Sequence, residues 1–143
     1  MRALKIALCA LLVLGVCATG FALAERVILD RYVGGWTDGE TSAYFRYDVD
    51  DFICRITRDD GEGTLVWEFD GGWYDEEAQA LVFMNCERYR EHIDMEALEL
   101  VEEDWSLIGL AFAEFKLSED GKTVTCTNIA GIDQPLILRW EKP

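Results

Sequence analysis

The chain has 143 residues, half of them hydrophobic, and its 13 basic and 28 acidic residues give a net charge of −15 at pH 7. This length suits a single domain with one core. Because so acidic a surface repels phosphate backbones and anionic lipid headgroups, the composition argues against a nucleic-acid-binding protein.

The N-terminal segment has the parts of a secretory signal peptide. Arg2 and Lys5 supply positive charge, residues 6–16 are almost wholly apolar, and residues 22–24 form the small-x-small sequence of a cleavage site. The apolar run is also close to the roughly 20 residues that span a bilayer, so a retained membrane anchor stays open as the alternative. The preferred interpretation is cleavage and secretion.

Cleavage gives the predicted domain organisation: a signal peptide over 1–24 and a secreted, extracellular domain over 25–143, with 11 basic and 28 acidic residues and a net charge of −17. No membrane contact is expected after cleavage. This domain keeps three cysteines at apolar positions, Cys54, Cys86 and Cys126. Two interpretations stay open. Either two of them pair in the oxidising compartment, or all three are buried thiols that act as small hydrophobic residues.

Alternation of apolar and polar residues predicts the first strands. It covers residues 42–49 and resumes at Phe52, with Asp50 and Asp51 between the two runs. The next turn, residues 58–63, is rich in Asp and Gly, which tolerate positive φ. Short polar connections of this kind indicate antiparallel neighbours.

The clearest strand signal comes next in the chain. Leu65, Trp67 and Phe69 fall on alternate positions, with Glu68 and Asp70 between, and the glycine pair 71–72 interrupts that alternation. Residues 75–79 are polar, and residues 81–84 form a second apolar run of strand length. The pattern predicts a β-hairpin.

The stretch after this hairpin carries two competing patterns. Met95, Leu98, Val101 and Trp105 fall at spacings of three and four, which predicts a short helix within 94–104. The chain around the stretch is patterned as strands, which favours an extended conformation. Both alternatives stay open.

Two more strands are predicted towards the C-terminus. Residues 118–122 form a tight-turn sequence with an Asp-Gly pair, and residues 123–127 and 136–141 alternate in strand fashion. This recurrence of strand and polar turn predicts an all-β fold. We expect a single antiparallel meander closed as a small barrel or folded as a sandwich, with a lipocalin-like shape among the options.

The predicted hairpin carries a resemblance to a known group of proteins. Trp67, then Tyr74 and Asp75, then Leu81 with Phe83, resembles the W…YD…L pattern of small, secreted, uncharacterised β-domain proteins of Gram-positive bacteria. The resemblance implies a fold and no established activity, so it transfers no site residues.

A second element of that group is also similar to this chain. It is a small-residue stretch before an aromatic strand and an acidic-Gly turn, and it resembles residues 109–115 and 119–121. The likeness covers most of residues 36–131 and implies strand for much of 97–117. The chain departs from the pattern after the second turn, where Thr125–Cys126 stand in place of the usual aromatic.

Signatures of catalysis or metal binding are sparse. His92 is the sole histidine, its charged neighbours are typical of a solvated loop, and no GxSxG, HExxH or CxxC motif occurs. Residues 48–51 and 59–62 offer the oxygens that calcium prefers, but neither group follows the frame of a calcium-binding loop. Acidic turns explain both groups, so no metal and no cofactor are expected.

Aromatic residues are the remaining signal, with five tryptophans and five tyrosines. Strand parity places Trp67 and Trp140 in the core. Trp36, Trp73 and Tyr74 lie beside glycines at strand ends, where a partly exposed ring is able to stack on a ligand. These three are the predicted ligand-binding residues, and no catalytic residue is predicted.

The favoured hypothesis is a secreted, non-enzymatic binding or interaction module for a small apolar ligand or a protein partner. Two alternatives stay open: an extracellular hydrolase that uses surface carboxylates or calcium, and a purely structural cell-surface protein. An apolar pocket bordered by Trp36 or Trp73 favours binding, whereas two carboxylates that converge in a cleft favour the hydrolase.

Overall fold

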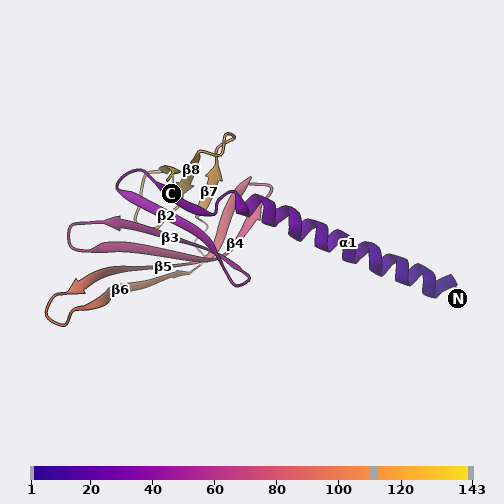
Figure 1. The fold of residues 1–143 in the computed structure, drawn as a ribbon, viewed down its shortest axis with the longest axis horizontal. Helices are drawn as coiled ribbons and strands as arrows, with labels where there is room; N and C mark the ends of the chain where they lie inside the picture. Colours follow the sequence, from indigo (N-terminus) through magenta and orange to yellow (C-terminus); the bar gives the residue numbers. More distant parts are fainter. Residues whose placement is uncertain (1, 110–112, 142–143) are drawn as a thin grey trace.

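The computed structural model describes residues 2–109 and 113–141, with side chains for 14–17, 19–106 and 113–141. Over these ranges the chain forms one helix and nine strands of a single antiparallel sheet (Figure 1). The elements are α1 (Arg2–Asp30), β1 (Gly34–Thr37), β2 (Thr41–Asp48), β3 (Asp51–Asp59), β4 (Thr64–Asp75), β5 (Ala80–Asp94), β6 (Glu99–Gly109), β7 (Glu114–Leu117), β8 (Thr123–Thr127) and β9 (Leu136–Trp140).

Eight of the nine strands close into a barrel. Neighbouring strands follow the order β4, β3, β2, β1, β9, β8, β7, β5, and β5 pairs again with β4. The first and last strands are joined where Trp36 lies opposite Trp140. The predicted all-β fold is confirmed, and of its two closures the barrel is the one that forms.

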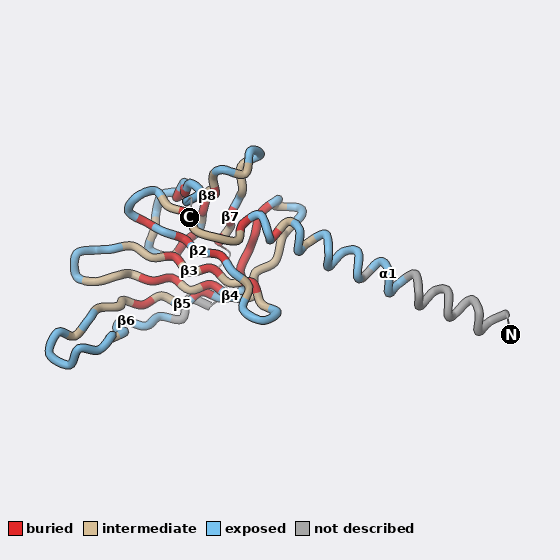
Figure 2. Tube along the Cα trace, in the orientation of Figure 1, coloured by how far each residue is buried: buried red, intermediate tan, exposed pale blue. Residues whose placement is uncertain are grey.

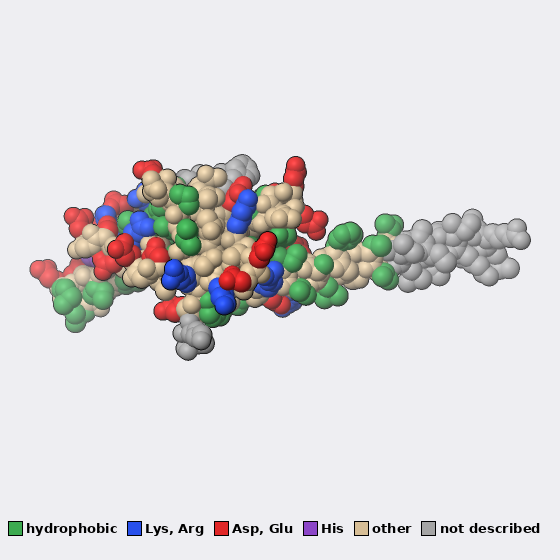
Figure 3. Space-filling view, turned by 90° about the horizontal axis from the view of Figure 1, so that it is seen from above, with side chains coloured by type: hydrophobic (Ala, Val, Ile, Leu, Met, Phe, Trp, Pro, Cys, Tyr) green, Lys and Arg blue, Asp and Glu red, His purple; other side chains and the backbone are tan. Residues whose placement is uncertain are grey.

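The ninth strand, β6, lies outside the closed barrel. One side of β5 pairs with β4 along most of its length, whereas its other side meets β7 at Leu81 and Val82 and β6 from Cys86 to Asp94. We call residues 88–106 the β5–β6 arm. It projects from the barrel on the side opposite α1 (Figure 1), and hydrophobic and acidic side chains gather at that end of the molecule (Figure 3).

Aromatic rings fill the inside of the barrel. Phe45, Phe69, Phe83 and Phe115 are at most 2% exposed, and the ring of Phe115 lies 5.4–5.5 Å from each of the other three. Buried residues accordingly lie along the strands of the barrel, whereas the loops and most of α1 are exposed (Figure 2). Trp67 belongs to the same core, as strand parity predicted. The interior is therefore filled by side chains rather than left as an open chamber.

The end of α1 and the residues after it close one end of the barrel. Leu29 and Tyr32 are buried, and the Tyr32 hydroxyl donates to the carbonyl of Phe115 (3.0 Å) and accepts from the N–H of Leu117 (3.3 Å). Burial raises the pKa of Tyr32 to about 12, so its phenol keeps its proton at physiological pH. α1 runs without a break through the predicted cleavage boundary, and its contacts with the barrel include residues before its last turn, such as Glu25.

The predicted helix within 94–104 does not form, and a hairpin turn takes its place. The carboxylate of Asp94 accepts hydrogen bonds from the backbone N–H groups of Glu96 (2.8 Å) and Ala97 (3.1 Å), and Leu98 has a φ of 55°. An Asp side chain that caps its own turn competes with helix formation, and the left-handed residue then returns the chain as a strand. The strand that the resemblance implied is confirmed for residues 99–109, whereas residues 110–112 lie outside the described part of the chain.

The β4–β5 hairpin uses the same turn. There the carboxylate of Asp75 accepts from the N–H groups of Glu77 (2.9 Å) and Ala78 (3.1 Å), and Gln79 has a φ of 50°. Both turns have the sequence Asp-x-Glu-Ala followed by the left-handed residue. The turn chemistry is therefore repeated although the strands around it differ.

The glycine pair 71–72 interrupts the alternation of β4 without ending the strand. Gly71 has a φ of 64°, which bends the strand where it enters the barrel wall. A Cβ on Gly72 would lie 2.7 Å from Cε1 of Phe83 and 2.9 Å from the carbonyl oxygen of Phe52. Glycine is therefore required where the backbone passes against the aromatic core.

Cys54, Cys86 and Cys126 are buried free thiols, so the second of the two sequence-based interpretations is the one that the structure supports. Cys54 and Cys86 lie opposite Phe69 from its two sides, which separates them by two strand spacings, about 9–10 Å. A disulfide needs Cα atoms within about 7 Å. Burial raises the pKa of Cys86 to about 12 and the pKa of Cys54 well above its usual value.

These thiols are expected to resist modification in the folded protein. Because the thiolate is the reactive form, iodoacetamide at pH 8 should add nothing to the folded domain over 25–143. The same reagent in guanidinium chloride should add three groups, as counted by mass spectrometry. Modification of Cys54 in the native state would contradict this prediction.

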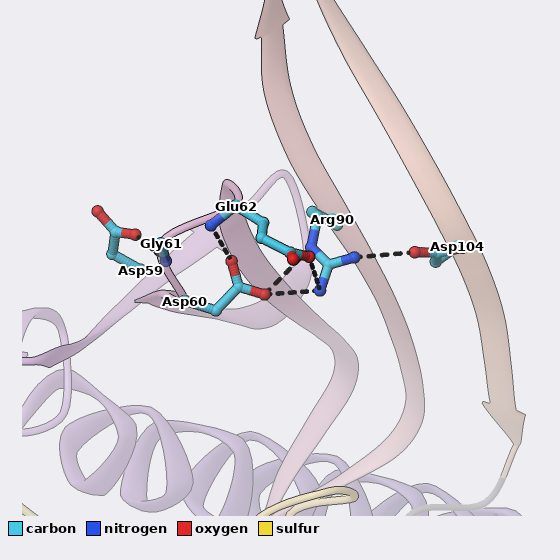
Figure 4. A network of polar contacts seen from close by, with 6 residues as sticks. All are labelled: Asp59, Asp60, Gly61, Glu62, Arg90 and Asp104. Atoms are coloured by element: carbon cyan, nitrogen blue, oxygen red, sulfur yellow. Dashed lines mark hydrogen bonds and ion pairs between the residues drawn. The ribbon is translucent and has the colours of Figure 1, made fainter.

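Arg90 ties the β5–β6 arm to the turn between β3 and β4 (Figure 4). Its guanidinium lies 2.6 Å from the carboxylate of Asp60 in that turn and 3.1 Å from the carboxylate of Asp104 in β6. The hydrogen bond from Arg90 lowers the pKa of Asp60 below its ordinary value of 3.8. The two hairpins are thereby fixed to one another.

Arg90→Gln is expected to return the pKa of Asp60 towards its ordinary value. A lowered pKa in the folded state stabilises the fold above the ordinary pKa, and that stabilisation disappears as the pH falls through the lowered value. The wild type should therefore exceed the variant in free energy of unfolding at pH 7, and the difference should shrink in strong acid. Denaturant unfolding at both pH values and an NMR titration of Asp60 test this.

The matched control for that titration is Arg46→Gln. Arg46 contacts Asp48 at 3.9 Å, and both side chains are more than half exposed. An exposed pair of this kind contributes little to stability. If this control lost as much stability at pH 7 as Arg90→Gln, the Arg90 cluster would have no special role.

Candidate functional site

A cavity of about 700 Å³ lies at the rim of the barrel, where the residue after α1 meets the β7–β8 turn and the end of β9. We call it the Trp140 groove. Its lining combines one large aromatic side chain with several charged ones: Arg31, Asp120, Lys122, Thr123, Arg139 and Trp140.

Trp140 forms the apolar part of this groove. Its inward parity is as predicted, but β9 ends at this residue, so the ring lies at the rim and is 40% exposed. The expectation that Trp140 is a core residue is therefore wrong. The ring rests on Gly34, where a Cβ would collide with it, and packs on Trp36 in a T-shaped arrangement at a centroid distance of 5.0 Å.

Trp36 is the support beneath this ring. It is fully buried, and its indole N–H donates to the carbonyl of Tyr32 (2.8 Å). The sequence-based expectation of a partly exposed ring at Trp36 is therefore wrong, because the residue faces the core and the end of the barrel covers it. Trp36 does not line the groove but supports the Trp140 ring that does.

Three cations line the groove together with Trp140. Arg31, Lys122 and Arg139 are exposed, and within the described ranges none of them has a carboxylate within 4.0 Å. The one acid of the groove, Asp120, accepts from the hydroxyl of Ser118 (2.6 Å), and this hydrogen bond lowers its pKa. In a chain of net charge −15, the groove therefore gathers unpaired positive charge beside an indole.

The other two predicted ligand-binding residues lie elsewhere. Trp73 and Tyr74 are both half-buried near the end of β4, and neither lines the Trp140 groove. Tyr74 lines a cavity of about 360 Å³ against α1, and its backbone N–H donates to the carboxylate of Glu25 (3.2 Å). Three further residues of that cavity, Phe21, Ala22 and Ala24, precede the predicted cleavage point. The structure thus does not bring Trp36, Trp73 and Tyr74 into one site.

A third cavity, of about 370 Å³, lies on the outer face of β2 to β5 and is lined by acids and arginines. Two of its carboxylates, those of Glu68 and Asp70, already have partners. Glu68 contacts Arg55 at 3.3 Å, and Asp70 accepts from the side-chain amide of Asn85 at 2.5 Å. Carboxylates that already hold such partners are poor candidates for general acid–base catalysis, because the partners occupy the oxygens that would have to face a substrate.

His92 lies within β5, opposite Val101, and is half-buried. The interpretation of its surroundings as a solvated loop is therefore wrong. The acids at 59–62 hold their own turn: Asp59 accepts from the N–H of Gly61 (2.8 Å). Among the residues that the structure describes, no group of three or more His, Cys, Asp or Glu side chains is placed to hold a metal ion.

Two broader observations complete the description. In the described part of the chain, no helix combines the length and the apolar character that crossing a membrane requires. Comparisons of the chain with protein-family models, with curated proteins and with solved structures gave no match. The geometry of the site alone carries the functional conclusion.

The cations of the Trp140 groove have no local sequence signal. Arg31 follows the helix, Lys122 lies in a turn and Arg139 lies near the C-terminus. The pairing of β8 with β9 brings the last two together, since Thr123 lies opposite Arg139 and the N–H of Trp140 donates to the carbonyl of Lys122. The one hint in the sequence is that basic residues follow α1 and flank Trp140.

Proposed function

We propose that this protein is a secreted, non-enzymatic binding module whose ligand is an amphipathic organic anion held in the Trp140 groove. The observation that carries the proposal is that Arg31, Lys122 and Arg139 line one groove with a half-exposed indole and have no ion-pair partner among the described residues. The ring offers a flat apolar surface, and the guanidinium groups suit a carboxylate or sulfonate geometrically.

The rim is the favoured place for a ligand because aromatic rings occupy the interior. An eight-stranded antiparallel barrel is lipocalin-like in outline, and lipocalins hold a small ligand inside. Here Phe45, Phe83 and Phe115 are fully buried in that space. The proposed module is therefore lipocalin-like in shape and differs in where it binds.

The proposed secretion fits the way the barrel is closed. Cleavage after Ala24 would leave Leu29 and Tyr32 in the end of the barrel, so the core would lose nothing. Three buried thiols with raised pKa would also persist in an oxidising compartment without pairing. The hydrolase alternative has less support, because Glu68 and Asp70 in the outer-face cavity are already engaged with an arginine and an amide group.

The test uses two dyes with the same aromatic body. 1-Anilinonaphthalene-8-sulfonate should bind the folded domain, whereas the uncharged N-phenyl-1-naphthylamine should bind at least about tenfold more weakly, a difference of about 1.4 kcal/mol. Trp140→Ala and Arg139→Glu should each weaken sulfonate binding about tenfold or more. Fluorescence titration measures each dissociation constant.

The control variant is Trp105→Ala, which removes another half-exposed tryptophan on the β5–β6 arm. It should leave dye binding unchanged. Equal binding of the two dyes, or an equal loss in Trp105→Ala, would show that the dye recognises general apolar surface and would overturn the proposal.

A further inference from the structure

The β5–β6 arm exposes apolar side chains that the barrel does not use. In the described part of the chain outside α1, ten large hydrophobic residues are exposed, and half of them belong to this arm. Figure 3 shows such side chains together with acidic ones at this end of the molecule. The five residues of the arm are Ile93, Met95, Leu98, Leu100 and Trp105.

β6 also has an unpaired edge. It pairs with β5, and across the described ranges no strand lies on its other side. At the hairpin end the N–H of Leu98 donates to the carbonyl of Asp94 (2.8 Å), which sets the alternation of the hydrogen bonds along the pair. Val101 therefore turns its backbone groups towards β5, whereas Leu100 and Glu102 turn theirs outward. An edge of this kind is a template for a further strand.

Two contacts hold one end of this edge against β5. The ring of Trp105 stacks on Tyr89 at a centroid distance of 4.1 Å, and Arg90 fixes Asp104 at 3.1 Å (Figure 4). Asp104 has a φ of 60° at the irregularity of pairing opposite residues 88–90. A strand that is fixed before it binds a partner loses little conformational entropy on binding.

The charge of β6 selects the partner. Half of residues 99–106 are acidic and none is basic: Glu99, Glu102, Glu103 and Asp104 carry the charge. A second copy of this strand would place acids opposite acids, which is destabilising across strands. Anionic lipid headgroups would be repelled in the same way. A strand that carries Lys or Arg complements this edge on both faces.

We propose that the outer edge of β6 binds an extended, cationic segment of another protein, which adds a strand to the sheet. Main-chain hydrogen bonds to Leu100 and Glu102 supply the register, and alternate side chains supply the specificity. The segment has Lys or Arg opposite Glu99, Glu102 and Glu103. It has apolar residues opposite Leu100 and Val101. This site is separate from the Trp140 groove, so either proposal stands if the other fails.

The probe is the blocked peptide TKKVLKT, labelled with a fluorophore and titrated with the folded domain in an anisotropy assay. Two N-methylated forms of the peptide carry the methyl groups on one or the other alternate set of backbone nitrogens. One form should lose binding by about tenfold or more, and the other should stay within about threefold of the parent peptide, because the donors of only one set face β6.

Matched variants of the protein give the second arm of the test. Glu102→Pro removes the outward N–H of residue 102 and should weaken peptide binding about tenfold or more, with unchanged circular dichroism. Glu102→Gln removes the charge alone and should cost about threefold or less. If Glu102→Pro does not fold, the N-methylated peptides on the wild-type protein decide the question.

Three outcomes would overturn the proposal. Equal binding of the two N-methylated peptides would mean ionic attraction to an acidic surface without strand addition. Dimers of the unliganded protein that Glu102→Pro abolishes would assign the edge to a second copy. Binding to phosphatidylcholine vesicles that Met95→Ser abolishes would assign the arm to a membrane surface.

Discussion

Phe83→Ala is expected to lower the free energy of unfolding by about 3–5 kcal/mol. The Phe83 ring is fully buried and lies within 6.5 Å of Phe45, Phe52, Phe69 and Phe115. Its removal leaves a cavity that the barrel wall cannot fill by collapse, because the backbone hydrogen bonds fix the wall. Denaturant unfolding, followed by circular dichroism, measures the loss.

The neighbouring Met84 provides the control for this substitution. Its side chain points out of the barrel and is 49% exposed. Met84→Ala should change the free energy of unfolding by less than about 1 kcal/mol. Similar losses in the two variants would mean that the interior is not packed around Phe83, and an internal ligand chamber would then regain support.

Trp36→Ala is expected to have an effect of similar size, about 3–5 kcal/mol. The substitution removes a fully buried indole, the hydrogen bond from that indole to the carbonyl of Tyr32 and the edge on which Trp140 rests. We expect a large loss of stability together with weaker dye binding. The binding loss would come from the displaced Trp140 ring.

Two other variants separate these effects. Trp36→Phe keeps a ring under Trp140 but leaves the Tyr32 carbonyl without its donor, so it should lose about 1–3 kcal/mol of stability and retain most binding. Trp140→Ala should keep most of the stability and lose most of the dye binding. If Trp36→Ala weakened dye binding with no change in stability, Trp36 would contact the ligand directly, as the sequence had suggested.

Strand parity located much of the core but not the ends of the strands. Alternation in β3 and β4 identified Cys54, Ile56, Trp67 and Phe69 as inward-facing, and all four are buried. The same rule placed Trp140 in the core, where it is not, because parity gives a direction and not a depth. When an inward-facing ring is at the last residue of a strand, no later residues of that strand cover it.

Met95, Leu98, Val101 and Trp105 have helical spacing, but the helix that this spacing predicted does not form. A hairpin also shows spacings of three and four when exposed apolar residues flank its turn. Met95 and Leu98 lie in the turn itself, and Trp105 packs on Tyr89 across the strand pair. The repeated Asp-x-Glu-Ala sequence at residues 75–78 and 94–97 was the stronger local signal. It marks a side-chain-capped turn in both places.

The candidate site lay beyond what the sequence was able to predict. Arg31, Lys122 and Arg139 meet because the barrel closes, and no spacing in the chain encodes that meeting. An excess of acids also hides a cationic cluster in any count of net charge. Only the three-dimensional pairing of β8, β9 and β1 reveals it.

The joining of β1 to β9 sets a condition on biosynthesis. The strand that begins the barrel pairs with the strand that ends it. The Tyr32 hydroxyl bonds to the carbonyl of Phe115 and the N–H of Leu117, which lie 83 and 85 residues further along the chain. Until the ribosome has made these later residues, β1 has no β9 to pair with, and Tyr32 has no partners with which to close the end of the barrel. Closure of the barrel must wait until β9 has left the ribosome, and factors that shield nascent strands should determine the yield of folded protein.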